Sequence, residues 1–269
     1  MLAGVDIGSR TTKVVIVNDG VILAHHIINT GVKPMLAGKM VLDAVLKEVG
    51  LKKEDLQCIV ATGYGRICLS EADQVVTELT CHARGTYFLN SQIRTVIDIG
   101  GQDSKVIRLS PDGSLDDFVM NDKCAAGTGR FLESAATVME VDPDALSRIA
   151  LKATNPCTIN STCAVFAESE IISLLAAEMR AADIAAGLYQ AFAQRIGNLA
   201  RRIRITPPMA LVGGGAKSQG LRHALMTNLD TDFTDLALDP QLVGALGAAV
   251  IAADIAESKP SGSFSKMSK

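Results

Sequence analysis

The sequence predicts an α/β protein built from two similar halves, and three observations support this. First, the 269 residues are 48% hydrophobic but only 4% aromatic, with no Trp, so the core must come from Ala, Val, Ile and Leu, which suits packed helices and sheets. Second, one strand–turn–strand pattern occurs twice. Third, a strand of buried type leads through Gly213-Gly214-Gly215 into a helix. Two copies of a repeat imply two similar halves rather than a solenoid.

The repeated pattern is D-I-G-x-x-x-[ST]-K-V. It lies within Val5 to Val15 in the first copy and within Ile97 to Ile107 in the second. In each copy a polar turn and a further apolar run follow, so each is predicted to form an antiparallel meander. The strands expected from the two meanders span residues 2–7, 12–17, 21–28, 97–99, 104–107 and 115–120.

The remaining elements follow from the spacing of apolar residues and from turn signals. Gly50 is expected to end a helix as a left-handed residue, and Gly63-Tyr64-Gly65-Arg66 is expected to form a tight turn after a short strand. The Ser/Lys/Gly-rich tail, 258–269, is expected to be disordered. Helices are predicted over residues 35–49, 131–139, 144–151, 164–182, 187–205, 219–228 and 240–256, with further strands at 57–62 and 209–212.

Charge and hydropathy exclude several classes of function. The formal net charge of −3 gives no electrostatic footprint for nucleic acid. The chain reaches Asp6 before a leader could form, and no stretch approaches about 18 uncharged apolar residues. We therefore expect a cytoplasmic protein with no membrane or nucleic-acid partner. Its six cysteines are expected to be buried thiols or metal ligands rather than disulfides; they are Cys58, Cys68, Cys81, Cys124, Cys157 and Cys163.

The two D-I-G turns are predicted to bind nucleotide phosphates. Glycines let backbone N–H groups approach a phosphate closely, and nearby hydroxyl and lysine side chains add donors and charge. Asp6 and Asp98, each at a strand end, could hold Mg²⁺ through water. The alternative is two ordinary hairpins, each with an Asp at a strand end. The phosphate-binding candidates are Gly8, Thr11, Thr12, Lys13, Gly100, Gly101, Ser104 and Lys105.

The Gly213-Gly214-Gly215 segment could present its backbone to an adenosine, because glycine permits close approach. It is not a phosphate-binding P-loop, since Lys217-Ser218 follows the glycines at the wrong spacing, and it does not match G-x-G-x-x-G. The alternative is a flexible connection between a strand and a helix.

Cys124 and Cys163 each lie just before an expected helix. The free N–H groups and the positive end of a helix dipole favour a thiolate-ligated cluster of negative charge. The alternative for each is a small buried hydrophobe. Two cysteines cannot supply the four thiolates of a cubane cluster, but a symmetric homodimer could, with the cluster on the two-fold axis. A zinc pair of Cys157 with Cys163 is conceivable but lacks a matching second pair. Cys58, Cys68 and Cys81 favour core positions.

Together these motifs resemble the BadF/BadG/BcrA/BcrD-type ATPase family. That family contains the activators of 2-hydroxyacyl-CoA dehydratases and the ATP-binding subunits of benzoyl-CoA reductase. The similarity covers about residues 2–255, and its most specific parts are Asp6 to Lys13, Asp98 to Lys105, Asn121 to Glu133, and Cys163 to Glu170. It implies a duplicated ribonuclease H-like, two-lobed ATPase of the acetate kinase/sugar kinase/Hsp70/actin fold. The first lobe would comprise residues 1–94 plus 241–257, and the second, with the cluster cysteines, residues 95–240.

The resemblance also implies a set of site residues. Cys124 and Cys163 of two protomers, in a homodimer or a pair of related subunits, would hold one 4Fe-4S cluster. Asp6, Asp98, Gln102 and Asp103 would serve hydrolysis, with Gln102 or Asp103 orienting the water near Mg²⁺ between the Asp-bearing turns. The implied ATP contacts are Ser9, Arg10, Thr11, Thr12, Lys13, Gly100, Gly101, Gln102, Gly214 and Gly215, with Asp142 at a helix start as a further candidate.

The implied activity is an ATP-driven electron pump. A ferredoxin or flavodoxin would reduce the cluster, and ATP hydrolysis would drive one electron to an acyl-CoA dehydratase or reductase component. One alternative is a small-molecule kinase of the same fold, in which a substrate hydroxyl replaces water. Another is a non-enzymatic, actin-like ATP-binding scaffold whose cysteines belong to the core. The sequence names neither the acyl-CoA substrate nor the electron donor, and it does not decide between a homodimeric activator and a reductase subunit.

Overall fold

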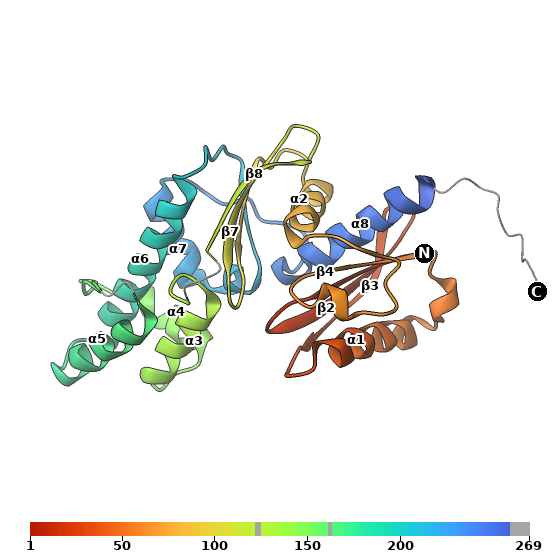
Figure 1. The fold of residues 1–269 in the computed structure, drawn as a ribbon. Helices are drawn as coiled ribbons and strands as arrows, with labels where there is room; N and C mark the ends of the chain where they lie inside the picture. Colours follow the sequence, from red (N-terminus) through yellow and green to blue (C-terminus); the bar gives the residue numbers. More distant parts are fainter. Residues whose placement is uncertain (122–124, 161–162, 259–269) are drawn as a thin grey trace, which may run out of the picture. The chain divides into compact units, whose positions relative to one another are not determined.

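The computed structural model describes residues 1–121, 125–160 and 163–258. The chain divides into two compact units (Figure 1). Unit 1 comprises Met1–Gly85 together with the segment from Gly244 onward, and unit 2 comprises Thr86–Val243. The lobe boundaries expected from the sequence stay a prediction. The expected tail lies outside the described residues from 259 onward, and Ser258 is the last residue of a helix.

Unit 1 is a five-stranded sheet with the strand order β3-β2-β1-β4-β5. The first three strands form the predicted antiparallel meander, whereas β4 pairs parallel to β1. The two-residue strand β5 was not predicted, because it is too short to show a period. The strands are β1 (Leu2–Ile7), β2 (Thr11–Asn18), β3 (Val21–Asn29), β4 (Cys58–Thr62) and β5 (Gln74–Val75).

Helices cover both faces of this sheet. Helix α1 (Pro34–Val49) begins with a proline and ends at Gly50, whose φ of 69° confirms the predicted left-handed cap. Its buried side chains, among them Val41 and Val45, pack on one face with Ile59 of β4, and each such burial contributes about 1.5–3 kcal/mol. Alternate residues of β4, Cys58 and Val60, instead face α2 (Glu78–Leu89) and α8 (Val243–Ser258).

Unit 2 repeats the meander in a four-stranded sheet with the order β8-β7-β6-β9. Its strands are β6 (Thr95–Ile99), β7 (Ser104–Leu109), β8 (Leu115–Asn121) and β9 (Met209–Val212). Here β9 pairs parallel to β6, as β4 does to β1. Both meanders also carry an irregularity at the matching place, between Ile16 and Val17 and between Arg108 and Leu109. The repeat is therefore confirmed at the level of strand pairing.

Five helices pack with the sheet of unit 2, and their shared core includes Phe131 and Phe192, whose ring centroids lie 6.3 Å apart. They are α3 (Gly129–Val138), α4 (Pro143–Ala150), α5 (Ala164–Ala176), α6 (Ala181–Ala200) and α7 (Gln219–Leu229). Short 3₁₀ turns join other elements, at Lys53–Asp55, Arg66–Cys68, Gly214–Lys217 and Pro240–Leu242.

The predicted helix over residues 164–182 starts where expected but its end at 182 is wrong, and so are both the start at 187 and the end at 205 of the next one. Helix α5 ends at Ala176 and α6 begins at Ala181. Between them Glu178 adopts a φ of 57°, a conformation that costs energy for a residue with a side chain. No Gly or Pro marks this break. It is stabilised instead by Asp183, whose carboxylate accepts N–H bonds of 2.9 Å from both Thr154 and Asn155, a tertiary contact that local spacing does not reveal.

One described segment, Pro240–Ser258, is long and apolar enough to reach across a bilayer, with a mean hydropathy of 1.3. Half of it is buried within the structure. Gly4 shows how closely it packs, because a Cβ there would lie 2.0 Å from the carbonyl oxygen of Ala245. These contacts are those of a core helix.

Candidate functional site

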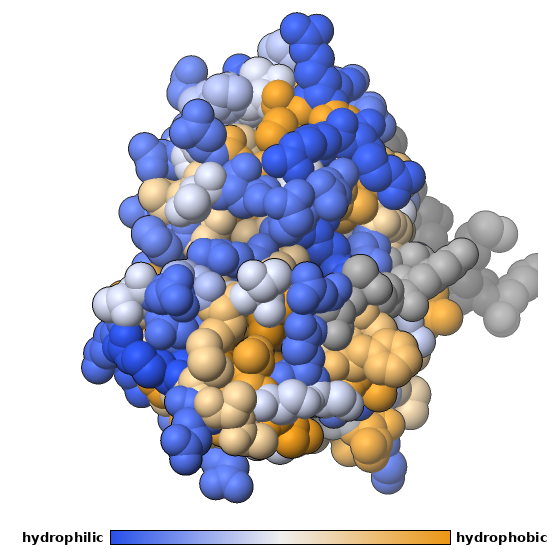
Figure 2. Space-filling view, turned by 90° about the vertical axis from the view of Figure 1, so that its left-hand side faces the viewer, coloured by the Kyte–Doolittle hydropathy of each residue, from blue (hydrophilic) through white to orange (hydrophobic). Residues whose placement is uncertain are grey.

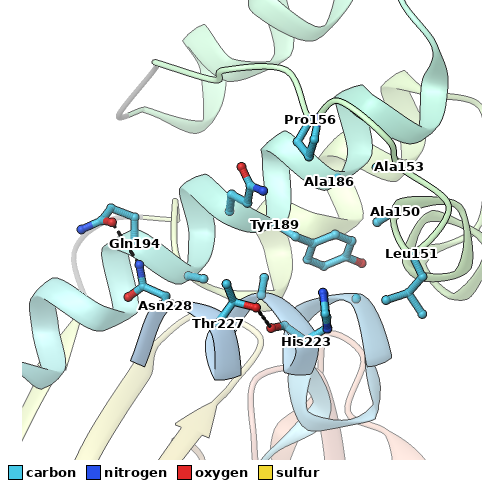
Figure 3. A pocket seen from close by; sticks show the side chains of 14 residues that line it. Ala150, Leu151, Ala153, Pro156, Ala186, Tyr189, Gln194, His223, Thr227 and Asn228 are labelled. Atoms are coloured by element: carbon cyan, nitrogen blue, oxygen red, sulfur yellow. Dashed lines mark hydrogen bonds between the residues drawn. The ribbon is translucent and has the colours of Figure 1, made fainter. Parts of the chain in front are cut away.

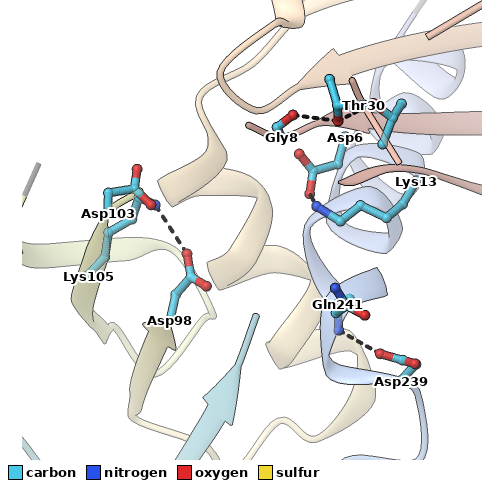
Figure 4. A network of polar contacts seen from close by, with 10 residues as sticks. Asp6, Gly8, Lys13, Thr30, Asp98, Asp103, Lys105, Asp239 and Gln241 are labelled. Carbon is cyan, nitrogen blue, oxygen red and sulfur yellow. Dashed lines mark hydrogen bonds and ion pairs between the residues drawn. The ribbon is translucent and has the colours of Figure 1, made fainter. Parts of the chain in front are cut away.

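The Asp-bearing turn of unit 1 is held by one buried ion pair. Asp6 of β1 and Lys13 of β2 are register partners, and Lys13 Nζ donates to Asp6 Oδ2 at 2.9 Å (Figure 4). The backbone of Gly8 closes the turn on Thr11 at 3.0 Å. The Thr12 hydroxyl is buried against Thr30 at 2.9 Å. The side chains left at the surface of the turn are therefore those of Ser9, Arg10 and Thr11.

The matching turn of unit 2 has the same pairing with a second carboxylate. Lys105 Nζ lies 3.2 Å from Asp98 Oδ2 and 2.8 Å from Asp103 Oδ1 (Figure 4). The Gly100 N–H bonds the Asp103 carbonyl at 3.0 Å, as Gly8 does to Thr11. Asp98 and Lys105 are buried, Asp103 is partly exposed and Gln102 is exposed. This turn therefore carries one more negative charge than its counterpart around a single lysine.

A glycine turn supports each aspartate from the neighbouring parallel strand. After β4, Gly63 has a φ of 86°, and a Cβ on it would lie 2.3 Å from Asp6 Oδ1. After β9, Gly213 has a φ of 81°, and a Cβ on it would lie 2.3 Å from Asp98 Oδ1. Only glycine fits both requirements. The Gly63-Tyr64-Gly65 segment is therefore the structural counterpart of Gly213-Gly214-Gly215, a match that the sequence analysis missed because Tyr64 interrupts the glycines.

The Asp98 turn of unit 2 is hydrogen-bonded to the start of helix α3, which follows Cys124 in the sequence. The N–H groups of Gly129 and Arg130 donate to the carbonyls of Gly100 and Gly101, at 2.8 and 3.0 Å. The Ser104 hydroxyl adds a bond of 2.5 Å to the Gly127 carbonyl. Two of the N–H groups that were expected to face an anion near Cys124 are thus used by the turn. Cys124 itself lies outside the described residues.

Cys163 is the residue that immediately precedes the first turn of α5, with extended backbone and no capping bond from its side chain. Its thiol is partly exposed. Two side chains of the first turn of α5, Val165 and Phe166, are 66% and 69% exposed. Helices α3 and α5 are joined by a hydrogen bond between Ser134 and Glu168. A partly exposed thiol at the start of a helix fits a thiolate ligand of a metal cluster.

The other described cysteines occupy ordinary positions, but Cys68 is partly exposed, so its predicted core position is wrong. Cys58 and Cys81 are fully buried in unit 1, and burial raises the pKa of the Cys81 thiol to about 12. Cys157 is buried in unit 2, where burial and then the nearby Asp183 raise its pKa. Within the described part of the chain, no group of three or more His, Cys, Asp or Glu side chains could hold a metal ion. A cluster at Cys163 therefore requires ligands beyond those described in one chain.

The segment after β9 leaves bare backbone at its centre. Gly214 is exposed, and a Cβ there would meet only Gln241 within 4 Å, at 3.4 Å. The turn is braced on one side by Lys217, whose Nζ lies 2.6 Å from Asp239 Oδ2. On the other side Ser218 caps α7 and contacts the Tyr189 hydroxyl at 3.1 Å. Such a backbone suits close approach of a ligand, as predicted for adenosine.

Asp142 is the N-cap of α4, and its Oδ1 accepts the Ala145 N–H at 2.6 Å. It is exposed, so its second oxygen is accessible to a ligand. Helix α4 in turn supports α7, because the Ser147 hydroxyl accepts the Gly220 N–H at 2.8 Å. Asp142 and the Gly214 turn thus lie just before two helices, α4 and α7, that pack together in unit 2.

A cavity of about 500 Å³ opens between the end of α4 and the facing sides of α6 and α7 (Figure 3). Tyr189 and His223 project into it in the view of Figure 3. At one end, Asn228 Nδ2 donates to Gln194 Oε1 at 3.0 Å. No local motif marks this cavity, because its walls come from three separate helices.

These features define a class of protein. The chain is a duplicated α/β nucleotide-binding protein, with an Asp–turn–Lys motif and a glycine turn in each unit. A glucokinase of the ROK family from Streptomyces griseus shares this fold, with a TM-score of 0.55 over 94% of this chain and 99% of the other, at 14% identity.

The chain belongs to the BadF/BadG/BcrA/BcrD ATPase family, whose model matches residues 3–252. A relative described as the (R)-2-hydroxyglutaryl-CoA dehydratase activating ATPase of Acidaminococcus fermentans is 42% identical over 251 residues, which cover 93% of this chain and 95% of the relative. A solved structure of the activator of 2-hydroxyisocaproyl-CoA dehydratase from Clostridium difficile, with bound ADPNP, is 44% identical. It covers 95% of both chains with a TM-score of 0.89. The predicted fold and family are therefore confirmed.

Proposed function

We propose that this ATPase uses ATP hydrolysis to drive one-electron transfer to an acyl-CoA dehydratase or reductase-type partner. The observation that supports this proposal lies in unit 2, where Gly129 and Arg130 of α3 hydrogen-bond to Gly100 and Gly101 of the Asp98 turn. A change at the turn must therefore reach the helix that follows the Cys124 segment. The names of the relatives, which are activators of dehydratases, support the same function.

The proposed nucleotide contacts are those expected from the sequence. Arg10 and Thr11 lie at the surface of the first turn, and Gln102 is exposed in the second. Lys13 and Lys105 are each paired with carboxylates. They would therefore act on a phosphate through the electrostatic field of the ion pair rather than by a direct hydrogen bond. The full set is Ser9, Arg10, Thr11, Thr12, Lys13, Gly100, Gly101, Gln102, Asp142, Gly214 and Gly215.

Magnesium is proposed to bind through water at Asp6 and Asp98. Both carboxylates are buried, and each already accepts a lysine on its Oδ2 atom. Direct ligation is therefore less suitable than contact through the hydration shell, which Mg²⁺ gives up reluctantly. Gln102 is better placed than Asp103 to orient the attacking water, because Asp103 is held by Lys105 at 2.8 Å.

The proposed electron carrier is one 4Fe-4S cluster per dimer, held by Cys124 and Cys163 of each protomer. When bound, such a cluster supplies a single-electron couple whose potential depends on hydrogen bonds and solvent access at its sulfurs. Cys163 fits as a ligand. The exposed apolar residues beside it favour burial by a second protomer. Apolar side chains gather in the lower part of the face shown in Figure 2.

Within this proposal the chain's own residues transmit the nucleotide state. ATP shifts the equilibrium only as far as its affinities for two conformations differ. The bonds from Gly100, Gly101 and Ser104 would carry that shift to the backbone between Gly127 and Arg130, and the Ser134–Glu168 contact would carry it to α5. The donor is proposed to be a ferredoxin or flavodoxin, and the protein to work in the cytoplasm.

Anaerobic purification followed by iron analysis and visible spectroscopy tests the proposal. We expect about four irons per dimer and loss of the charge-transfer absorbance in Cys163→Ala and in Cys124→Ala. The matched control is Cys68→Ala, which also removes a partly exposed thiol but lies in unit 1.

Two outcomes would contradict the proposal. An iron-free protein that phosphorylates a sugar would favour the kinase alternative, in which a substrate hydroxyl takes the place of water. A cluster that survives both cysteine substitutions would leave electron transfer in place but remove Cys124 and Cys163 as its ligands. Native mass spectrometry of the iron-loaded protein would then report the number of chains per cluster.

A further inference from the structure

An exposed apolar surface lies on unit 1, at the start of α1 and on the turn after β4. We call Val32, Met35, Tyr64 and Ile67 the Tyr64 surface; their exposed fractions are 95%, 65%, 76% and 82%. The two segments adjoin, because a Cβ on Gly65 would lie 3.2 Å from the Cβ of Pro34. Leu36 and Met40 extend the apolar surface along α1. Contiguous exposed apolar side chains of this size mark interaction sites in soluble proteins.

The charged side chains within the two segments that form the Tyr64 surface are positive. Lys33 and Lys39 are exposed and Arg66 is partly exposed, and the nearest acidic residues along the chain, Asp43 and Glu71, lie just beyond these segments. Lys33 is the N-cap residue of α1, and the first turn of that helix carries no acidic residue. A cation at the N-terminus of a helix opposes the helix dipole. This arrangement is unfavourable for the isolated helix and complementary to an acidic partner.

The same turn supports the predicted phosphate site. The Gly65 N–H donates to the Ile7 carbonyl at 2.8 Å, and the Cβ positions of Gly63 and Gly65 lie 2.3 Å from Asp6 Oδ1 and 2.5 Å from Ile7 Cγ2. Backbone packed this closely against Asp6 and Ile7 transmits a displacement to them. A ligand bound at Tyr64 and a ligand bound at the Asp6 turn would therefore both act on the turn that follows β4.

The counterpart turn in unit 2 shows that Tyr64 is not needed to support the aspartate. Gly213 and Gly215 make the corresponding contacts with Asp98 and Ile99, and the residue between them is Gly214. Unit 2 thus presents bare backbone where unit 1 presents a large exposed aromatic ring. Tyrosines of this kind supply contact area at protein interfaces.

We propose that the Tyr64 surface docks the electron-accepting protein, through a complementary surface with an apolar centre and an acidic rim, and that the Gly63–Cys68 turn couples docking to the nucleotide. This inference rests on the proposed function. A second copy of this chain is a poorer occupant, because a two-fold contact would place Lys33, Lys39 and Arg66 against themselves. Coupling between two sites is reciprocal, so nucleotide must change partner affinity by the factor by which partner changes nucleotide affinity.

The test uses the purified full chain and the acyl-CoA dehydratase component from the same cells, with affinity measured by biolayer interferometry in ADP and in a non-hydrolysable ATP analogue. We expect a nucleotide-dependent affinity for the wild type. Tyr64→Asp combined with Ile67→Asp should weaken it at least about tenfold, as for the loss of central interface anchors. Lys33→Glu with Lys39→Glu should weaken it several-fold and flatten its dependence on salt.

Val21→Asp is the matched control, since Val21 is an apolar residue of unit 1 that is 61% exposed and lies at the β2–β3 turn. It should leave the affinity unchanged. The substituted side chains are exposed, so circular dichroism and basal ATP hydrolysis should match the wild type in every variant.

Wild-type affinity in the Tyr64→Asp, Ile67→Asp variant, or absence of binding by the wild type, would overturn the inference. So would loss of self-association in that variant, or loss of binding to phosphatidylserine-containing vesicles. Binding needs no reductant and no iron. A wild type that holds no iron even after anaerobic purification, yet still binds through Tyr64, would therefore contradict the proposed electron transfer and leave the docking surface standing.

Discussion

The two Asp–turn–Lys motifs share their strand register but differ in what surrounds the lysine. In unit 1 Lys13 pairs with Asp6 alone, at 2.9 Å. In unit 2 Lys105 is shared between Asp98 and Asp103, because position 103 carries a carboxylate where the first copy has Thr11. The hydroxyl before each lysine also differs in its partner. The Thr12 hydroxyl contacts the Thr30 hydroxyl within the sheet. The Ser104 hydroxyl instead donates to the carbonyl of Gly127, in the segment between Cys124 and α3.

This comparison suggests that the duplicated unit has been divided between two tasks. The second copy has the additional carboxylate, the bare Gly214 backbone and the bonds to α3. The first has a self-contained ion pair and an exposed Tyr64 on its supporting turn. Three predictions test this division by comparing a residue of one copy with its counterpart in the other, and a fourth tests the burial of a cysteine in unit 1.

The largest expected effect is on stability. Asp6→Asn leaves Lys13 as a buried cation without a carboxylate, and breaking a buried pair in this way costs about 3–5 kcal/mol. Asp98→Asn leaves Lys105 with Asp103, so the cost should be nearer about 1–2 kcal/mol. Urea unfolding, followed by hydrogen exchange in β1–β2 and β6–β7, measures both. Equal costs would show that Asp103 does not compensate, and Asp98→Asn with Asp103→Asn should raise the cost in unit 2 to that of unit 1.

The next effect concerns nucleotide affinity. Gly214→Tyr copies the side chain of unit 1 into the bare backbone of unit 2 and should lower the affinity for an ATP analogue at least about tenfold, or about 1.4 kcal/mol. The Gly214 site has open space beyond Gln241, so the fold should tolerate the change. The reciprocal Tyr64→Gly should leave nucleotide affinity within about twofold. Isothermal titration calorimetry measures the affinity of both variants for the ATP analogue. Equal losses of affinity in the two would argue against the division of tasks.

A smaller effect is expected on coupling. Ser104→Ala removes the bond to Gly127, a net interaction worth about 1 kcal/mol. ATP should still be hydrolysed and iron retained, but fewer electrons should be transferred per ATP. Thr12→Val is the matched control, because it removes the equivalent hydroxyl of unit 1 with little change in shape. Since Thr12 is also a proposed nucleotide contact, ATP hydrolysis by this variant is measured alongside. Stopped-flow spectroscopy of electron transfer, compared with phosphate release, gives the ratio. An equal loss of coupling in both variants would contradict a specific route through Ser104.

The effect that is smallest near neutral pH appears only at high pH. Burial raises the pKa of Cys81 from 9.0 to about 12 in the folded chain. Its contribution to stability is therefore fully present below pH 9.0 and declines as pH rises towards 12, because the unfolded thiol ionises first. Cys81→Ala should flatten that decline in urea unfolding. In iron-free native protein, iodoacetamide should label the partly exposed Cys163 and spare Cys81, and rapid labelling of Cys81 would contradict its burial.

Much of this fold could be predicted because the motif itself specifies the pairing. In D-I-G-x-x-x-[ST]-K the Asp and the Lys lie opposite each other across a short hairpin, as Asp6 and Lys13 do. The family follows from the same residues. The equivalence of Gly63 and Gly213 could not be seen, because Tyr64 breaks the glycine pattern and only the contacts with Asp6 and Asp98 reveal it. The break between α5 and α6 was missed because Asp183 stabilises it from outside the local sequence.

The sequence by itself determined the duplication, the strand register and the residue types available for phosphate and thiolate chemistry, since these depend on local spacing. Tertiary structure decided which partners those residues take. Gly129 and Gly100 are well separated in the chain and meet only because α3 begins beside the β6–β7 turn. Tyr64 and Val32 join one surface only because the turn after β4 packs at the start of α1. Such contacts depend on how whole helices and strands pack together, and short-range sequence patterns do not predict that packing.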